Sequence, residues 1–224
     1  LVLLYALSPH LSTPFFKFFR FPAESLLPAG RPAEGRIPGG PVRSPITEGI
    51  ASSLYFRYTE KNISGRNGLM DILVLSDSHG AVAPMIRAVE LPAPNLIIHL
   101  GDCWRDGERL HTYFPDIPLE QVPGNCDFRP TEPAERLLVL RDKRILLCHG
   151  HTYGVKQSLV TAGFAAEEQQ LDLFLFGHTH KPLVDRRGRT LFLNPGSIGD
   201  STRPSYAVVT IQGGQLDGRT VWLA

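Results

Sequence analysis

Five short apolar runs in this 224-residue sequence each end in a cluster of polar residues that commonly bind metals. A short apolar run of this kind is consistent with a buried strand. Open α/β sheets bind ligands in the crevice beyond the carboxyl ends of their strands, so five such strands would deliver their polar side chains to one crevice. The five clusters are Asp77-Ser-His79, Gly101-Asp102, Gly124-Asn125-Cys126-Asp127, His149-Gly-His151 and Gly177-His178-Thr-His180.

Taken alone, each cluster can also be explained without a metal, because polar residues at a strand end often form hydrogen bonds with the nearby backbone. The Asp77-x-His79 tripeptide is of a kind that occurs often by chance, and Gly101-Asp102 is weaker still. The whole set is far more specific, because all five clusters follow an apolar run. Together they predict a metal site at one edge of a sheet.

The fold class is predicted from the alternation of strand-like and helix-like segments after Met70. Apolar strands are expected at 72–75, 96–98, 137–140, 145–147 and 173–176, and helices at 82–91, 104–113 and 155–170. The end of the chain, 182–223, is rich in β-type segments with glycines where hairpin turns are needed. This order predicts an α/β layered fold with two sheets.

Residues 1–69 differ from the rest in composition, since they hold eight of the nineteen prolines and show no sustained helical or strand period. We predict that 1–69 is an irregular extension, either disordered or translated from a wrongly assigned start, and that the catalytic domain is 70–224. The Phe-rich stretch 15–21 leaves open a docking or membrane-surface role. Met70 is the first methionine and immediately precedes the first convincing strand.

Charge and cysteine content narrow the class of protein. The net charge of +1 favours neither sequence-specific nucleic-acid recognition nor a membrane anchor. Residues 70–224 carry fifteen Lys and Arg against eighteen Asp and Glu, so a phosphate site there needs positive charge from bound metal. Three cysteines without a C-x-x-C pair predict a cytoplasmic protein. No apolar run approaches the length of about 20 residues that spans a bilayer.

The series D-x-H, GD, GN-x-D, H-x-H and G-H-x-H resembles the calcineurin-like metallophosphoesterases, and the variants GNCD and FLNPGS are similar to the small YfcE-type phosphodiesterases. The resemblance covers 70 to about 210 and implies a β-sandwich flanked by helices, with two metals at one edge. It further implies that one metal is held by Asp77, His79 and His180, the other by Asn125, His149 and His178, and that Asp102 bridges them.

Imidazole and carboxylate ligands without thiolate suit two divalent transition-metal ions, with Mn²⁺ preferred and Fe²⁺, Ni²⁺ or Zn²⁺ as alternatives. Such a pair can share a hydroxide that attacks phosphorus in line, so no protein nucleophile is needed. Asn125 and His151 are predicted to donate hydrogen bonds to the phosphate oxygens. Many members of the superfamily have a histidine where this chain has Cys126, so the general acid is left open between His151 and metal-bound water.

The predicted function is the hydrolysis of phosphoric esters, with a small phosphodiester as substrate. A phosphomonoesterase or nucleotidase on the same metals is one alternative. The other is a metal-bound protein-interaction scaffold, because one retromer subunit resembles this fold. The oligomeric state is left open, with a homodimer as one option.

Several other polar residues have two readings at this point. His99 lies inside an apolar run and is expected to be a satisfied strand residue rather than a metal ligand. Asp106 and Asp127 are either acceptors that support the ligands or simple caps. The segment 194–197 (NPGS) is a turn that either supports the site or serves the fold alone.

Overall fold

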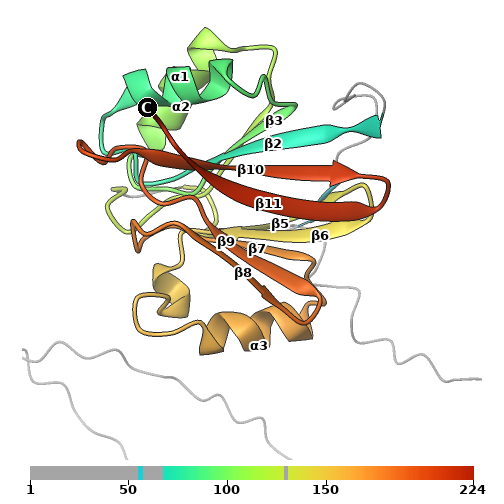
Figure 1. Cartoon of the computed structure of the whole chain (residues 1–224). Coiled ribbons are helices and arrows are strands. Elements are labelled where there is room, and N and C mark those ends of the chain that lie inside the picture. The colour runs from blue at the N-terminus through green and yellow to red at the C-terminus, as the bar shows by residue number, and fades with distance from the viewer. Residues whose placement is uncertain (1–54, 58–67, 129–130) are drawn as a thin grey trace, which may run out of the picture. The chain divides into compact units, whose positions relative to one another are not determined.

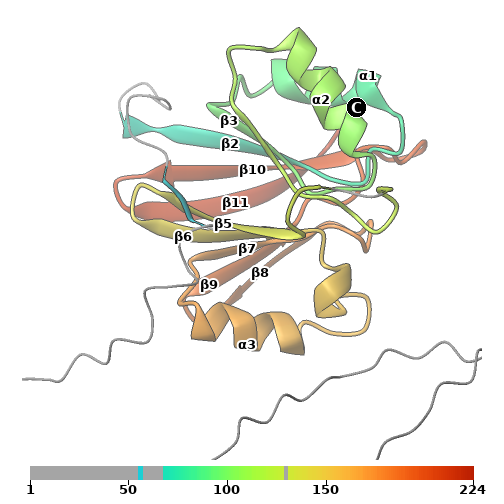
Figure 2. The same cartoon turned by 180° about the vertical axis from the view of Figure 1, so that it is seen from behind.

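The computed structural model describes residues 55–57, 68–128 and 131–224. The chain divides into two units, 1–43 and 44–224, and every described residue belongs to the second. In this unit two sheets pack face to face, and helices cover their outer faces (Figures 1 and 2). The predicted fold class, an α/β two-sheet sandwich flanked by helices, is confirmed.

The five-stranded sheet has the order β11-β10-β2-β3-β4. Its strands are β2 (Met70–Leu75), β3 (Leu96–His99), β4 (Leu119–Gln121), β10 (Ser205–Gln212) and β11 (Gln215–Trp222). β2, β3 and β4 run parallel, and β10 is antiparallel to both β2 and β11. The carboxyl ends of β2, β3 and β4 therefore meet at one edge of this sheet.

The six-stranded sheet has the order β1-β5-β6-β7-β9-β8. Its strands are β1 (Tyr55–Arg57), β5 (Glu135–Leu140), β6 (Lys143–Cys148), β7 (Leu173–Leu175), β8 (Leu183–Arg187) and β9 (Thr190–Asn194). β6, β7 and β9 are parallel, whereas β5 and β8 run antiparallel to their neighbours β6 and β9. The carboxyl ends of these three parallel strands also share one edge.

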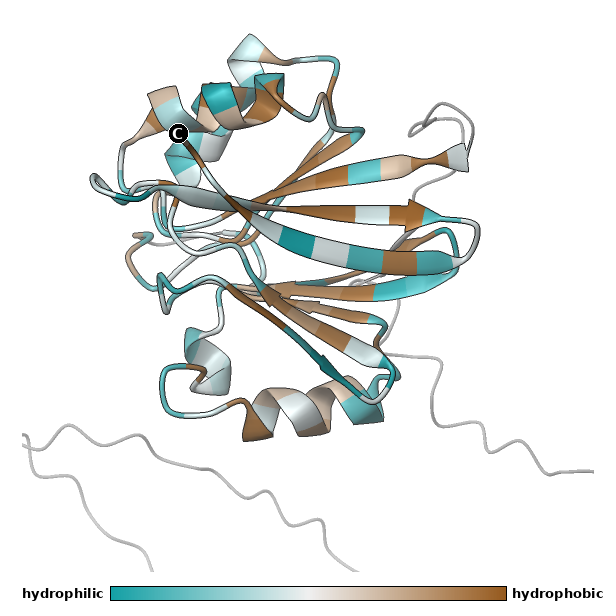
Figure 3. Cartoon of the chain, in the orientation of Figure 1, coloured by the Kyte–Doolittle hydropathy of each residue, from teal (hydrophilic) through white to brown (hydrophobic). Residues whose placement is uncertain are grey.

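Alternation along the strands divides the core into layers. In β2, Ile72 and Val74 point between the sheets, where they join a cluster that also holds Ile145 and Leu147 of β6. Leu73 belongs instead to a cluster beneath the helices that cover the five-stranded sheet. A strand covered on both faces needs apolar residues at every position, which is why β2 reads as an unbroken apolar run. Figure 3 shows these central strands as mostly hydrophobic and β8, at the sheet edge, as largely hydrophilic.

The helices are α1 (Val82–Glu90), α2 (Trp104–Tyr113) and α3 (Val160–Glu168). The first two pack on the five-stranded sheet and α3 on the other (Figure 1). The helix predicted over 155–170 is shorter than expected, because residues 154–157 form a turn in which the Gln157 amide donates to the Gly154 carbonyl at 3.0 Å. This turn follows a 3₁₀ turn, η2 (His151–Tyr153), and begins at the left-handed Gly154 with φ of 62°. Ser158 Oγ then accepts the Val160 amide at 3.4 Å, where the helix begins. No helix among residues 68–128 and 131–224 is long and apolar enough to cross a membrane.

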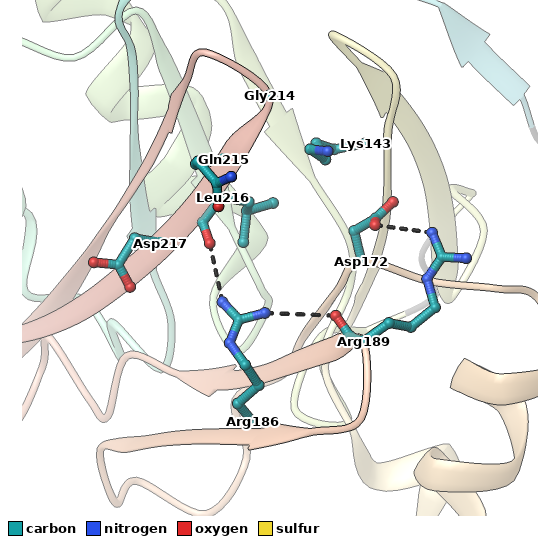
Figure 4. Close-up of a pocket in the computed structure, with 8 residues that line it drawn as sticks. All are labelled: Lys143, Asp172, Arg186, Arg189, Gly214, Gln215, Leu216 and Asp217. Carbon is teal, nitrogen blue, oxygen red and sulfur yellow. Dashed lines mark hydrogen bonds and ion pairs between the residues drawn. The ribbon is translucent and has the colours of Figure 1, made fainter.

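The two sheets are also linked at the end of the domain where β6 and β7 begin. Arg186 of β8 donates a hydrogen bond to the Leu216 carbonyl of β11 at 2.9 Å. Arg189 forms an ion pair with Asp172 at 2.9 Å. With Lys143 they line a cavity of about 510 Å³ (Figure 4). None of the predicted site residues lies in this cavity.

Strand β1 lies inside the segment that was predicted to be an irregular extension. It pairs in parallel with β5, with Tyr55 opposite Leu137, and so forms one edge of the six-stranded sheet. The other residues of 1–67 lie outside the described part of the chain. The domain boundary at Met70 stays a prediction.

Removing residues 1–69 is expected to leave a folded domain, because the apolar clusters described above begin at Met70, and the described structure that is lost is the edge strand β1 and the contact of the Gly68 carbonyl with Arg141. Thermal unfolding of a chain beginning at Met70 should be cooperative. Its melting temperature should lie within about 8 °C of that of a chain beginning at Ser44, which keeps β1, since an edge strand of three residues is worth about 1–2 kcal/mol. A Met70 chain that stays unfolded beside a folded Ser44 chain would show that β1 belongs to the domain.

Candidate metal centre

The turns at the carboxyl ends of the strands are hydrogen-bonded to each other across the two sheets. The His178 amide, after β7, donates to Asp77 Oδ2, after β2, at 3.1 Å. The His149 ring, after β6, contacts the Leu100 carbonyl, after β3, through Nδ1 at 2.8 Å. The crevice predicted from the strand ends is therefore formed by both sheets rather than by one.

Four of the predicted ligands converge closely. The ligand atoms of Asp77, His79, Asp102 and His180 all lie within 4.8 Å of one another, which is a separation that one cation can bridge. His180 Nε2 is 3.1 Å from Asp77 Oδ1 and 3.4 Å from His79 Nε2. Two imidazole nitrogens that face each other so closely can both be satisfied by a cation between them.

His149 adjoins this group and is fully buried. Its Nε2 lies 3.4 Å from Asp102 Oδ1 and 3.9 Å from Asp77 Oδ1. The contact of Nδ1 with the Leu100 carbonyl requires Nδ1 to carry the proton, because a carbonyl only accepts. Nε2 is thus the nitrogen left to bind a metal, and the backbone contact fixes the orientation of the ring.

The remaining predicted residues are His178, His151 and Asn125. The ring of His178 lies 5.0 Å from that of His149 between centroids, and the ring of His151 lies 5.5 Å away. Asn125 is exposed, and its amide nitrogen contacts the Cys126 sulfur at 3.4 Å. No contact of the Asn125 side chain with the other predicted ligands is seen in the described part of the chain, so its role as a ligand stays a prediction.

The backbone at the site is strained in a consistent way. Left-handed φ angles at non-glycine residues are uncommon, are unfavourable by about 1–2 kcal/mol each and cluster at functional sites. Five of the predicted ligands have such angles: Asp77 (54°), His79 (45°), Asp102 (58°), His178 (66°) and His180 (58°). The sequence pattern contains no signal for these backbone angles.

Asp127 holds the turn that carries Asp102. This places Asp127 among the acceptors that support the ligands, one of the two roles that the sequence left open for it. Its carboxylate accepts four backbone amides, those of Asp102, Cys103, Trp104 and Gly124, at 2.7–3.1 Å. It therefore holds the loop after β3 against the loop after β4. Sequence reasoning could not separate this role from that of a cap, because three of the four amides are more than twenty residues away.

Asp106 supports the loop after β2 in a similar way. Its Oδ2 accepts the Ser78 hydroxyl at 2.8 Å and the Gly80 amide at 2.7 Å. His99 contacts the same hydroxyl through Nε2 at 3.2 Å, and burial lowers the pKa of His99 to about 4, so its ring stays neutral at neutral pH. The reading of His99 as a satisfied strand residue is consistent with this contact.

The segment 194–197 supports the site as well as forming a turn. Asn194 Nδ2 donates to the Gly177 carbonyl at 2.7 Å, directly before the predicted ligand His178. Ser197 donates its hydroxyl hydrogen to the Asp77 carbonyl at 2.8 Å. Two ligand-bearing turns, one from each sheet, are thus held by this one segment.

The polar atoms of the site fit divalent cations. Asp77 Oδ1 and His149 Nε2 are buried, and neither has a hydrogen-bond partner among the described residues. Buried polar atoms rarely lack a hydrogen-bond partner, so these two atoms indicate that a cation binds between them. Burial by itself would raise the pKa of Asp102, but the adjacent His149 ring and the hydrogen bond from the Cys126 amide hold that pKa well below its usual value. Asp102 is therefore ionised, as a metal ligand must be.

Comparison with known proteins agrees with this geometry. Residues 70–214 match the calcineurin-like phosphoesterase superfamily domain. The chain is 36% identical over 149 residues to the probable metallophosphoesterase YsnB of Bacillus subtilis, covering 64% of this chain and 85% of YsnB. It is 30% identical over 155 residues to the phosphodiesterase YfcE of Escherichia coli K12, covering 58% of this chain and 80% of YfcE. A crystal structure of a predicted phosphoesterase from Streptococcus pneumoniae TIGR4 superposes with a TM-score of 0.58 at 27% identity, covering 69% and 90% of the two chains.

Proposed function

This chain belongs to the calcineurin-like phosphoesterase superfamily, and we propose that it hydrolyses a small phosphodiester with two divalent metal ions. The observation that carries the proposal is the convergence of Asp77, His79, Asp102 and His180 within 4.8 Å, beside the buried His149. A single ion needs fewer protein ligands than this crevice offers. The preference for a diester is supported by the likeness to the phosphodiesterase YfcE.

The ligands divide between the two ions as the family resemblance implies. One ion would be held by Asp77, His79 and His180. The other ion would be held by His149, His178 and Asn125, and Asp102 would bind both ions. A bound pair of divalent ions supplies positive charge for the phosphate and a water-derived nucleophile at neutral pH. Mn²⁺ is our preferred ion, because the proposed ligands are nitrogen and oxygen atoms only. The three cysteines are free thiols, which supports a reducing compartment such as the cytoplasm.

The chain's own residues would bind the phosphate and handle protons. His151 is the candidate proton donor, since its ring adjoins that of His149 and its buried Nδ1 has no hydrogen-bond partner among the described residues. Asn125 is exposed beside the centre and would donate from its amide to a phosphate oxygen. The Asp102 carboxylate and burial raise the pKa of the Cys126 thiol, so Cys126 is protonated at neutral pH and a poor nucleophile.

The test of this function is hydrolysis of methyl p-nitrophenyl phosphate by the full chain. Activity should disappear on treatment with a chelator and return on addition of Mn²⁺. Metal analysis should find about two ions per chain. p-Nitrophenyl phosphate, a monoester with the same leaving group, serves as the comparison.

Three outcomes would contradict parts of the proposal. Faster turnover of the monoester would favour a phosphomonoesterase. A chain that binds metal but hydrolyses neither ester would favour the interaction scaffold. Activity that does not respond to chelation would remove the metal mechanism.

His151→Ala is expected to slow the chemical step, whereas Cys126→Ser should retain most activity. Burial and the neighbouring His149 lower the pKa of His151, so the protonated, proton-donating form is the minor one at neutral pH and becomes more populated as the pH falls. A lost general acid matters most for poor leaving groups, and its contribution is on the order of 10²-fold or more. We therefore expect His151→Ala to reduce kcat on methyl phenyl phosphate much more than on methyl p-nitrophenyl phosphate.

The comparison of the two esters also detects the opposite assignment. If Cys126→Ser shows the dependence on leaving group and His151→Ala does not, Cys126 is the proton donor. If neither variant shows a dependence on the leaving group, the proton comes from water. Circular dichroism on both variants checks that the fold is unchanged.

A further inference from the structure

A cavity of about 710 Å³ lies directly beside the candidate metal centre. Among the described residues, its walls are formed by the start of α2 and by residues 127–128 and 131–132, which follow β4. Cys103, next to Asp102 in sequence, and Asp127 line it. Its volume is in the range of cavities that hold small organic molecules.

Hydrogen bonds connect this cavity rigidly to the metal centre. Asp127 accepts the Asp102 amide through Oδ2 at 3.1 Å and the Trp104 amide through Oδ1 at 2.7 Å. Phe128 follows Asp127 directly in sequence. One carboxylate therefore fixes the backbone of two aromatic wall residues relative to a predicted ligand of both metals.

The side chains of the cavity combine aromatic surface with charged groups of both signs, since Arg105 and Arg109 line it together with Asp106, Asp127 and Glu132. Trp104 and Phe128 line it, and the side chain of Phe128 is 87% exposed. The Trp104 indole donates to Glu108 at 3.2 Å, which restrains the ring. Arg105 and Arg109 lie one helical turn apart on α2, both exposed, and neither forms a salt bridge within the described part of the chain.

We infer that this cavity binds the nucleobase of a nucleoside phosphoester whose phosphate lies at the metal centre. The inference rests on the proposed function and names the class of substrate for that site. Aromatic side chains stack on the faces of bases, and arginine stacks on bases and donates to their edges. An acyl chain would instead place apolar surface against the charged side chains of Arg105, Arg109 and Asp127.

The test compares two ligands that differ only in the base, AMP and ribose 5-phosphate. Their binding to the full chain loaded with Mn²⁺ is measured by isothermal titration calorimetry. AMP should bind about tenfold or more tightly than ribose 5-phosphate, the scale of one stacked base. Trp104→Ala and Phe128→Ala should each reduce this ratio severalfold, while the affinity for ribose 5-phosphate stays within about twofold.

Tyr113→Ala is the matched control, because Tyr113 is an exposed aromatic residue at the far end of the same helix and does not line the cavity. In Tyr113→Ala, the ratio of the affinity for AMP to the affinity for ribose 5-phosphate should equal the ratio in the unaltered chain. Phe128→Ala guards against misfolding, since a side chain this exposed contributes little to the core. Equal binding of AMP and ribose 5-phosphate, no binding of either, or a ratio unchanged in both variants would overturn the inference.

Hydrolysis of methyl p-nitrophenyl phosphate, which has no base, separates this inference from the proposed function. An active enzyme without a preference for AMP overturns the inference alone. A preference for AMP in a chain that hydrolyses no phosphoester overturns the proposed function alone.

Discussion

Hydrolysis by a chain carrying Asp102→Ala is expected to fall by well over 100-fold, and metal should be lost from both proposed sites. Residues that only orient a metal ligand already change activity by about 10–100-fold when replaced, and Asp102 is proposed to bind both ions. Its carboxylate is nearly buried, lies 3.4 Å from His149 Nε2 and accepts the Cys126 amide at 2.9 Å. Its ligand atom also lies within 4.8 Å of those of Asp77, His79 and His180, so Asp102 adjoins both proposed groups of ligands.

The measurement pairs metal analysis with kcat/KM on methyl p-nitrophenyl phosphate. Asp116→Ala, at an exposed position outside the site, is the control and should keep full activity and metal content. Circular dichroism confirms that both variants fold. Two bound ions and near-normal turnover in Asp102→Ala would show that Asp102 is not the shared ligand.

Gly124→Ala is expected to lower the melting temperature by about 5–10 °C and to abolish most activity. A Cβ at this position would lie 2.1 Å from Asp102 Oδ1 and 2.4 Å from the Asp102 backbone nitrogen. The backbone cannot move aside easily, because the Asp102 amide is held by Asp127. Overpacking of this kind typically destabilises by about 1–3 kcal/mol, and here it displaces a proposed ligand of both metals.

Gly163→Ala in α3 is the matched control, since a Cβ there would meet no atom within 4 Å. Alanine is favoured over glycine in a helix by about 1 kcal/mol, so this variant should melt at the same temperature or slightly higher. Differential scanning fluorimetry on both variants measures the contrast. A Gly124→Ala chain as stable and active as Gly163→Ala would contradict the close approach of the two loops.

The strand ends were predictable because their signal is local. An apolar run covered on both faces, followed by a polar cluster, can be read from a few consecutive residues, as at β2 and Asp77. The relative position of the clusters could then be inferred from the general behaviour of parallel strands. The clusters that hold Asp77, His79, Asp102, His149 and His180 can be found in the sequence in this way, and the ligand atoms of these residues lie close together in the structure.

Features that depend on contacts distant in sequence were not predictable. β1 holds the strand-favouring Tyr55 and Phe56, but it is too short to stand out from its irregular surroundings, and its pairing is with β5, some eighty residues later. The acceptor role of Asp127 depends on where the loop after β3 lies. The start of α3 was placed too early, because the apolar pattern that begins at Val155 runs through a hydrogen-bonded turn, in which the Gln157 and Ser158 amides donate to the Gly154 carbonyl, before the helix starts at Val160.

The proposed ligands come from both sheets, and this has a consequence for how the domain unfolds. Asp77, His79 and Asp102 follow strands of the five-stranded sheet, whereas His149, His178 and His180 follow strands of the six-stranded sheet. A cation bound by both groups acts as a cross-link between two halves that otherwise adhere largely through apolar packing. The domain's resistance to heat should then rise with the free metal concentration, by mass action. Cleavage by a protease that attacks the opened state should slow in the same proportion, so metal supply would set the lifetime of the protein.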